Sequence, residues 1–245
     1  MELNIGILMA GSLYWDEGRR KVWRDARLLP ETACAVTAPI RYGRKSSRRG
    51  NTYTMVFSRG CPLGEAKVVT CRSQITSADD LMVEAEQLWK AERLSDRANH
   101  QVSAPWGCVA LLVRPSAQVP PNLLRSWAKR TSSESNYGSV PQTEGEGTLV
   151  GDDGILRIAW PEPAGGESQT PLKLDLLLAT VTHPTLDDNK YPSAQAIASA
   201  WGEADPDEVL YFRSNRRHSI RTFQDEEILA ELREAHPRQY AIATE

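Results

Sequence analysis

A short apolar run near the N-terminus, followed at once by a Gly-Ser turn, is the feature that most constrains this chain. Residues 3–9 are rich in Ile and Leu and contain no charge after Glu2, which predicts a buried strand. Such a strand belongs in the middle of a sheet, because both its faces need to contact protein rather than water. At Gly11 and Ser12 the chain leaves the sheet, and the N–H groups there can bind an anion such as a carboxylate. An ordinary turn would show the same residues.

More strands and one long helix follow this turn. Residues 16–28 are highly charged and predict a short helix or a surface excursion, and strand-like runs cover residues 32–42, 51–58, 64–72 and 105–114. The connections between the first of these strands are too short for parallel crossovers, so we expect an antiparallel arrangement. Residues 78–93 predict a helix that Ser77 caps, with Asp79 and Asp80 near the positive end of its dipole.

One carboxylate of this helix falls where an apolar side chain is expected. At about 100° per residue an apolar line runs along the helix through Leu81, Ala85 and Leu88, and the next residue on that line is Glu92. A core-facing carboxylate is either paired or kept for chemistry. If the helix frays near residue 91, Glu92 simply reaches solvent. Glu84, on the flank of the same line, is the reserve candidate.

Basic residues gather in two places. The first group is Arg41, Arg44, Lys45, Arg48 and Arg49, and the second is Arg213, Arg216, Arg217, His218 and Arg221. Both groups could contact nucleic acid, although a solvated hairpin tip and a solvated face are simpler interpretations. The net charge of −3 and a pI near 5.9 argue against a general nucleic-acid or membrane-surface binder.

The second half of the chain is less regular. It predicts helices at 121–130, 193–201 and 224–235, strands at 154–160, 173–181 and 208–212, and long surface loops within 131–170. We divide the chain into residues 1–116 and a C-terminal α/β elaboration, residues 117–245. This second part either completes the same sheet or covers the site.

Metal, membrane and secretion signals are missing from the sequence. Cys34, Cys61, Cys71 and Cys108 lack the Cys-x-x-Cys spacing of zinc sites, and the four histidines are scattered, so we expect no metal site. No apolar run approaches the roughly 20 residues that cross a bilayer. The N-terminus lacks a basic start, so the expected location is the cytoplasm. Walker, dinucleotide and nucleophile-elbow motifs are likewise not found.

Three short motifs between residues 3 and 114 resemble the γ-glutamylcyclotransferase-like family. They are the Gly-Ser-Leu-x-Trp signature at Gly11-Ser12-Leu13 with Trp15, the Leu-x-x-x-Glu spacing at Leu88 and Glu92, and the Arg-Gly pair of the glutathione-degrading branch at Arg49-Gly50. The chain departs from the family at Ala10, where Tyr is usual, and at Trp89, where Asp often follows Leu.

The resemblance implies an α+β fold with a small mixed, mostly antiparallel β-barrel and packed helices. It also implies an enzyme without metal or cofactor that cyclises a γ-glutamyl group to 5-oxoproline and releases an amine. Glu92 would be the general acid/base, the amides of Gly11, Ser12 and Leu13 would hold the substrate, and Arg49 would bind a substrate carboxylate.

Tyr53, in the strand after the Arg-Gly pair, is assigned to the pocket wall by its position alone.

Two further interpretations of the function stay open beside the cyclotransferase. A barrel that kept ligand binding but lost catalysis would fit the change at Ala10 and the long second half. A nucleic-acid-associated protein that uses the two basic groups is the third hypothesis.

Overall fold

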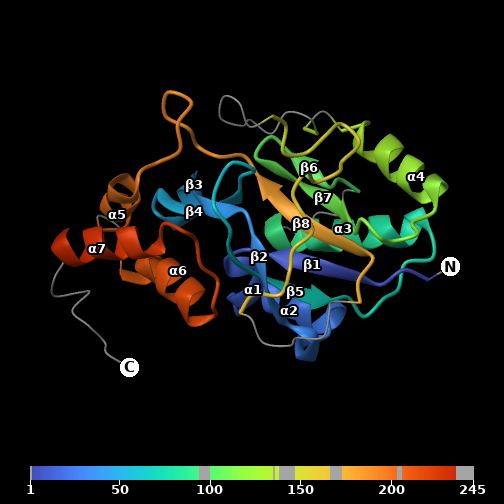
Figure 1. Cartoon of the computed structure of the whole chain (residues 1–245), viewed down its shortest axis with the longest axis horizontal. Helices are drawn as coiled ribbons and strands as arrows, with labels where there is room; N and C mark the ends of the chain where they lie inside the picture. The colour runs from blue at the N-terminus through green and yellow to red at the C-terminus, as the bar shows by residue number, and fades with distance from the viewer. Residues whose placement is uncertain are drawn as a thin grey trace.

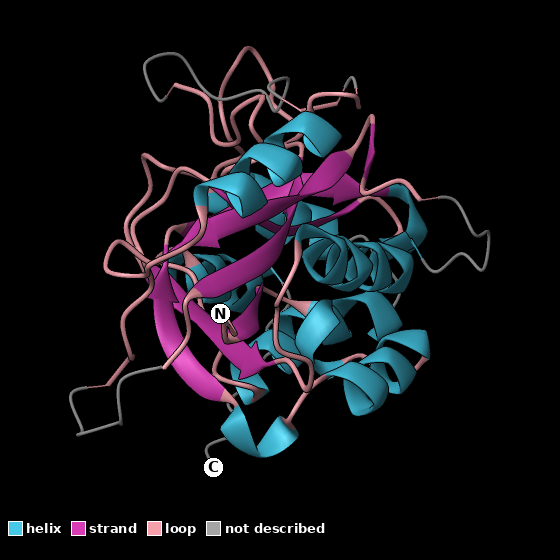
Figure 2. Cartoon of the chain, turned by 90° about the vertical axis from the view of Figure 1, so that its right-hand side faces the viewer, coloured by secondary structure: helices cyan, strands magenta, loops and turns pink. Residues whose placement is uncertain are grey.

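The computed structural model describes residues 2–93, 100–134, 136–137, 147–165, 173–202 and 206–235, with the side chains of residues 206–209 left out. Its strands run through the middle of the molecule with helices around them (Figures 1 and 2). The main sheet has the strand order β2-β5-β1-β8-β7-β6. These strands are β1 (Ile5–Met9), β2 (Cys34–Ala38), β5 (Gly64–Thr70), β6 (Ser103–Ala104), β7 (Gly107–Val113) and β8 (Leu176–Thr182).

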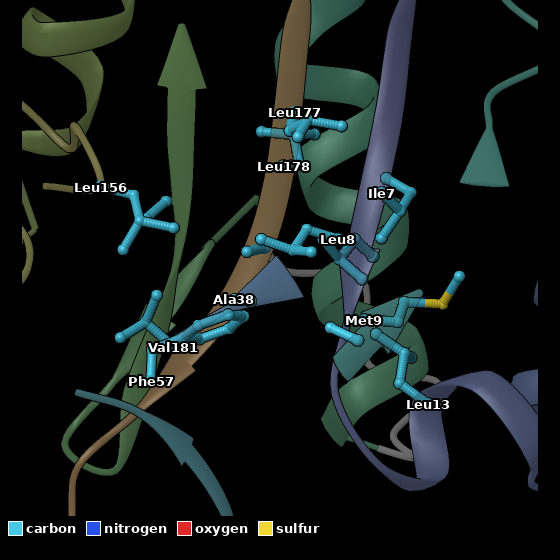
Figure 3. Close-up of a cluster of buried hydrophobic side chains, with 14 of the residues drawn as sticks. Ile7, Leu8, Met9, Leu13, Ala38, Phe57, Leu156, Leu177, Leu178 and Val181 are labelled. Carbon is cyan, nitrogen blue, oxygen red and sulfur yellow. The ribbon is translucent and has the colours of Figure 1, made fainter. Parts of the chain in front are cut away.

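The apolar run near the N-terminus forms the buried strand β1 in the middle of this sheet, as predicted. Ile7 pairs antiparallel with Val69 of β5 and parallel with Leu178 of β8. All other strand pairs of the sheet are antiparallel. Figure 3 shows Ile7 and Leu8 of β1 close to Leu177 and Leu178 of β8, in the apolar core.

The sheet is mixed and mostly antiparallel, but it is not closed into the barrel that the resemblance implies. Its edge strands in the described residues are β2 and β6. The outer edge of β2 is occupied by a later segment, because Thr37 donates its N–H to the carbonyl of Glu162 at 2.8 Å and Ala164 donates to Ala35 at 2.9 Å. Because this later segment already pairs with the outer edge of β2, that edge does not pair with β6 to close the sheet into a barrel. After Pro39 the chain leaves the sheet and forms a separate hairpin of β3 (Ile40–Ser46) and β4 (Thr52–Phe57).

Helices cover the sheet and the hairpin. They are α1 (Ser12–Trp15), α2 (Arg19–Arg27), α3 (Ala78–Arg93), α4 (Pro121–Thr131), α5 (Ala194–Gly202), α6 (Pro206–Arg217) and α7 (Asp225–Ala235). The predicted start of α3 is confirmed, since the N–H of Asp80 donates to Ser77 Oγ at 3.1 Å and its carboxylate accepts the N–H of Ser77 at 2.9 Å. No helix among the described residues combines the length and hydropathy that a membrane span requires.

Two predicted strands of the second half are wrong. Residues 208–212 belong to α6, whose buried Tyr211, Phe212 and Asn215 follow helical spacing, so packing overrode the strand propensity of the segment. Residues 154–160 form isolated bridges at Ile155 and Leu156 rather than a continuous strand. Strand β8, by contrast, completes the sheet between β1 and β7.

The three C-terminal helices gather beside the β3–β4 hairpin (Figure 1). Tyr42 of β3 lies edge-on to Trp201 of α5, with ring centroids 4.8 Å apart, and Trp201 contacts Phe212 of α6 at 4.9 Å. These rings are buried, so the second half of the chain fixes the position of a hairpin from the first half.

Asp225, at the start of α7, gives the fold a pH dependence that can be measured. It is only 2% exposed, and its Oδ1 accepts hydrogen bonds from the N–H and Oγ1 of Thr222. Burial raises the pKa of Asp225 despite these hydrogen bonds and the nearby Arg216. A raised folded-state pKa favours the protonated carboxyl, so this contribution is complete below the unfolded pKa of about 3.9 and is lost as the pH rises through the folded value.

We therefore expect Asp225→Asn, which is neutral at every pH, to become more stable relative to wild type as the pH rises from about 4 to about 7. Urea unfolding of both proteins across this range measures the difference in free energy of unfolding. A difference between Asp225→Asn and wild type that is constant with pH would contradict the assignment.

Candidate active site

Helix α2 holds the Gly-Ser-Leu turn in place through two arginines one helical turn apart. Arg24 donates from its guanidinium to the carbonyl oxygens of Leu13 and Asp16, each at 2.7 Å. These carbonyls belong to the end of the short helix α1, where backbone acceptors lack helical partners. Arg20 lies on the same face of α2 and donates from Nη1 to Ser12 Oγ at 2.6 Å.

The guanidinium of Arg20 also reaches helix α3. Its Nη2 donates to Glu92 Oε2 at 2.7 Å, and the two side chains are only 11% and 16% exposed. Burial would lower the pKa of Arg20, but the carboxylates of Glu92 and Asp16 outweigh it and raise that pKa above its usual value. Ser12 and Glu92, two residues that the sequence assigned to the site, therefore meet at one charged group.

Glu92 has one anchored oxygen and one open oxygen. Helix α3 continues to Arg93, so it does not end before Glu92. Leu88, one turn earlier on the predicted line, is fully buried. Oε2 of Glu92 is held by Arg20, whereas Oε1 accepts no hydrogen bond from any described residue. A carboxylate held in this way has a fixed position and still has an oxygen that can exchange a proton.

The Tyr211 side chain of α6 packs against the other side of the turn. Gly11 has φ +88°, and a Cβ added there would lie 2.3 Å from the hydroxyl of Tyr211, so only glycine fits. The N–H of Met55 donates to that hydroxyl at 3.2 Å. One turn along α6, Asn215 accepts a hydrogen bond from Nε1 of Trp15 at 2.7 Å.

Arg49 lies on aromatic rings at the same place. Its guanidinium carbon is 4.9 Å from the ring centroid of Tyr211 and 5.8 Å from that of Trp15. Arg49 is half-buried against these rings, so its side chain is not simply solvated at the tip of the hairpin. It forms no ion pair with a described residue, which leaves its charge available to a ligand. Tyr53 is buried under Lys45, and no hydrogen bond or ring contact joins it to Glu92 or to the turn within the described chain.

The reserve candidate Glu84 has a different environment. It is 3% exposed, and both its oxygens are engaged by the guanidinium of Arg27, with Nε 3.3 Å from Oε2. Arg20–Glu92 and Arg27–Glu84 thus form two rungs between the antiparallel helices α2 and α3. This geometry favours a structural role for Glu84, because neither of its oxygens is open to a substrate.

The structure also brings residues to the site that sequence reasoning did not select. Arg20 lies in the charged segment 16–28. Its spacing of four residues from both Asp16 and Arg24 places the three side chains on one helical face, and this spacing could have selected Arg20 from the sequence. Tyr211 was hidden by the assignment of its segment to a strand. Arg44, known only as part of a basic group, is close enough to Glu92 for this carboxylate to oppose the lowering of its pKa by burial.

Two hollows lie elsewhere on the molecule. One, of about 570 Å³, lies between α3 and α4 and includes Glu86, His100 and Arg130 in its lining. The other, of about 340 Å³, is lined by Leu63, Phe223 and their neighbours. Neither is lined by Glu92 or by the turn.

Glu84→Gln tests the structural assignment of the second rung. Glutamine keeps the shape and one acceptor but removes the charge, so we expect the free energy of unfolding to fall by about 1–2 kcal/mol. The partial exposure of Arg27, at 29%, limits the loss, because its guanidinium can reach water. Urea unfolding measures the change, and Asp79→Asn in the first turn of α3 is the control. Unchanged stability in Glu84→Gln would contradict the assignment.

No protein-family model, no curated protein and no solved structure matches this chain. Within the chain itself, the candidate site consists of the Gly-Ser-Leu turn, the Arg20–Glu92 pair, Arg49 and Tyr211. Residues from five separate segments meet there, around a carboxylate with one open oxygen.

Proposed function

We propose that this chain is a cytoplasmic γ-glutamylcyclotransferase-like enzyme, which converts a γ-glutamyl group into 5-oxoproline and releases an amine without metal or cofactor. The main support is that Arg20 contacts both Ser12 and Glu92. Two of the three segments that carry the family resemblance are far apart in the sequence and meet at this guanidinium. We also propose that this fold, an open sheet with a separate hairpin, is related to the barrels of that family.

The reaction is a ring closure within the substrate. The α-amine of the γ-glutamyl group attacks its own γ-carbonyl carbon, a new C–N bond closes the five-membered ring, and the C–N bond to the leaving amine breaks. The attacking nitrogen loses a proton and the leaving nitrogen gains one, so a single carboxylate can perform both transfers. Oε1 of Glu92 is the atom to which we assign them. Holding amine and carbonyl in the attacking geometry supplies much of the rate.

Arg20 suits this cycle as a positioning residue. Nη2 of Arg20 holds Oε2 of Glu92 at 2.7 Å, so the substrate meets the other oxygen, Oε1. The ion pair also fixes the rotamer of Glu92, which keeps Oε1 in one place.

The surroundings of the pair suit an anionic substrate. In the proposal the amides of Gly11, Ser12 and Leu13 hold the substrate carboxylate or carbonyl oxygen, and Arg49 pairs with a carboxylate. The hydroxyl of Tyr211 stands at this turn in a chain that has Ala10 where the family usually has Tyr. Tyr53 is kept as part of the pocket wall.

A ligand-binding protein without catalysis is the second candidate, because the Arg20–Glu92 pair already satisfies much of the carboxylate's charge. Nucleic-acid binding has less support. Arg49 lies on aromatic rings, and Arg216 of the second basic group pairs with Glu226 at 3.0 Å, so these charges do not form one free basic surface.

Glu92→Gln tests the catalytic assignment. Glutamine keeps the hydrogen bond to Arg20 but cannot carry a proton, so we expect turnover to fall by roughly 100-fold or more while the protein still folds and binds ligand. The measurement is release of 5-oxoproline from a panel of γ-glutamyl amino acids, peptides and amines.

Glu84→Gln is the matched comparison on the same helix. If Glu92→Gln kept full turnover while Glu84→Gln lost it, the role would move to Glu84. If wild-type protein bound γ-glutamyl compounds but released no 5-oxoproline from any of them, the binding protein would replace the enzyme.

Arg49→Gln tests carboxylate recognition. Because Arg49 lies beside the turn but does not touch Glu92, we expect the KM for a γ-glutamyl substrate to rise by about tenfold, with kcat changed much less. Steady-state kinetics measure both constants. Lys45→Gln on the same hairpin is the control, and equal kinetics for both variants would exclude a substrate contact by Arg49.

A further inference from the structure

Arg44 of β3 carries a positive charge that the described residues compensate only in part. Its guanidinium carbon lies 5.0 Å from the ring centroid of Trp106, and it forms no ion pair with a described residue. Burial lowers the pKa of Arg44, Glu92 opposes this from a distance, and Arg48 adds to it. A half-buried guanidinium that rests on one ring face still has N–H groups for an acceptor.

His183 stands next to this arginine. The segment after β8 runs along β3, because Thr185 donates its N–H to the carbonyl of Gly43 at 2.7 Å. The N–H of His183 donates to the carbonyl of Trp106 at 2.9 Å. The end of β8 accordingly lies between β3 and β6 in Figure 1. The Nε2 atom of His183 is buried and has no hydrogen-bond partner in the described part of the chain.

Trp106 connects this pair to the candidate active site. Its ring stacks on that of Trp89 in α3, with centroids 4.5 Å apart and planes 15° from parallel. Trp89 precedes Glu92 by three residues, so both lie on neighbouring positions of one helical face. Arg44, His183 and Trp106 are therefore grouped on the Trp89 side of Glu92, whereas Arg49 and Tyr211 lie at the Gly-Ser-Leu turn.

We infer that Arg44, His183 and Trp106 form a second anion subsite, which takes a carboxylate on the leaving-amine side of the substrate. A carboxylate there would accept hydrogen bonds from the Arg44 fork and from Nε2–H of His183. Its charge would offset the partly buried guanidinium. Burial and Arg44 lower the pKa of His183, which favours the neutral imidazole; in the tautomer with its proton on Nε2, this ring donates one hydrogen bond to the carboxylate.

The alternative is that the ring of Trp106 alone stabilises Arg44, as a cation–π pair without any ligand. The two cases differ in what the protein selects. A subsite favours a substrate with a second carboxylate, whereas a purely structural pair gives no such preference. The inference rests on the proposed function for the γ-glutamyl group at the turn, but selectivity and turnover are separate readouts.

The subsite can be tested with two γ-glutamyl compounds that differ only in one group on the leaving amine. γ-Glutamylglycine carries a carboxylate on its leaving amine, and γ-glutamylethylamide carries a methyl group at the same position. Calorimetric titration of the full chain gives the dissociation constant of each probe, and 5-oxoproline release is followed in parallel. We expect wild type to bind γ-glutamylglycine about tenfold or more tightly than the ethylamide, as one charged hydrogen-bonded contact predicts.

Arg44→Gln keeps the side-chain stem and removes the charge, so it should abolish this preference while leaving the affinity for the ethylamide unchanged. His183→Phe should weaken the preference in the same direction. Arg48→Gln, which removes an exposed charge from the same hairpin, is the control and should retain the preference.

Equal binding of the two probes by wild type, or a preference that survives Arg44→Gln, would overturn the subsite and leave the proposed function standing. A preference that depends on Arg44 without release of 5-oxoproline would support the subsite and remove the proposed catalysis. Failure of both probes to bind would overturn both.

Discussion

The partly buried positive charge of Arg20 is the constraint on which the candidate site depends. A guanidinium removed from water needs acceptors and a compensating charge, and Arg20 finds them in Ser12 and Glu92. Because Ser12 lies in α1 and Glu92 lies in α3, these contacts favour one arrangement of α1, α2 and α3. The same contact that supports the fold also orients the carboxylate that we propose as the catalyst.

This arrangement extends through the two helices and then across the molecule. The Arg27–Glu84 rung sets α2 against α3 at the other end, so Glu92 cannot shift along the pair without breaking both contacts. On the opposite side, Asn215 and Tyr211 of α6 contact the turn through Trp15 and Gly11. The C-terminal helices therefore support the site as well as the hairpin, which explains how a late part of the chain contributes to a site that begins at the first strand.

Much of the architecture around the site could be predicted. Strand β1 was predicted as central from its two apolar faces, and α3 from its cap and its apolar line, which also selected Glu92. The closed barrel could not be tested by such patterns, because closure depends on which backbone occupies the edge of β2. That edge is taken by residues near Pro163, a contact across more than a hundred residues. The helix α6 was misassigned because β-branched and aromatic residues favour strands until packing decides otherwise.

The sequence by itself determined the elements whose signals are local: the buried first strand, the glycine turn after it, and a capped helix with a carboxylate on its core-facing line. Only the tertiary structure decided what surrounds that carboxylate. Arg20 is 72 residues away from Glu92 in the chain, and Trp15 and Asn215 are 200 residues apart. Periodicity and capping depend on neighbours within a few residues, so they state which way a side chain faces. They contain no information on which distant segment supplies its partner, because that choice is made when the helices pack.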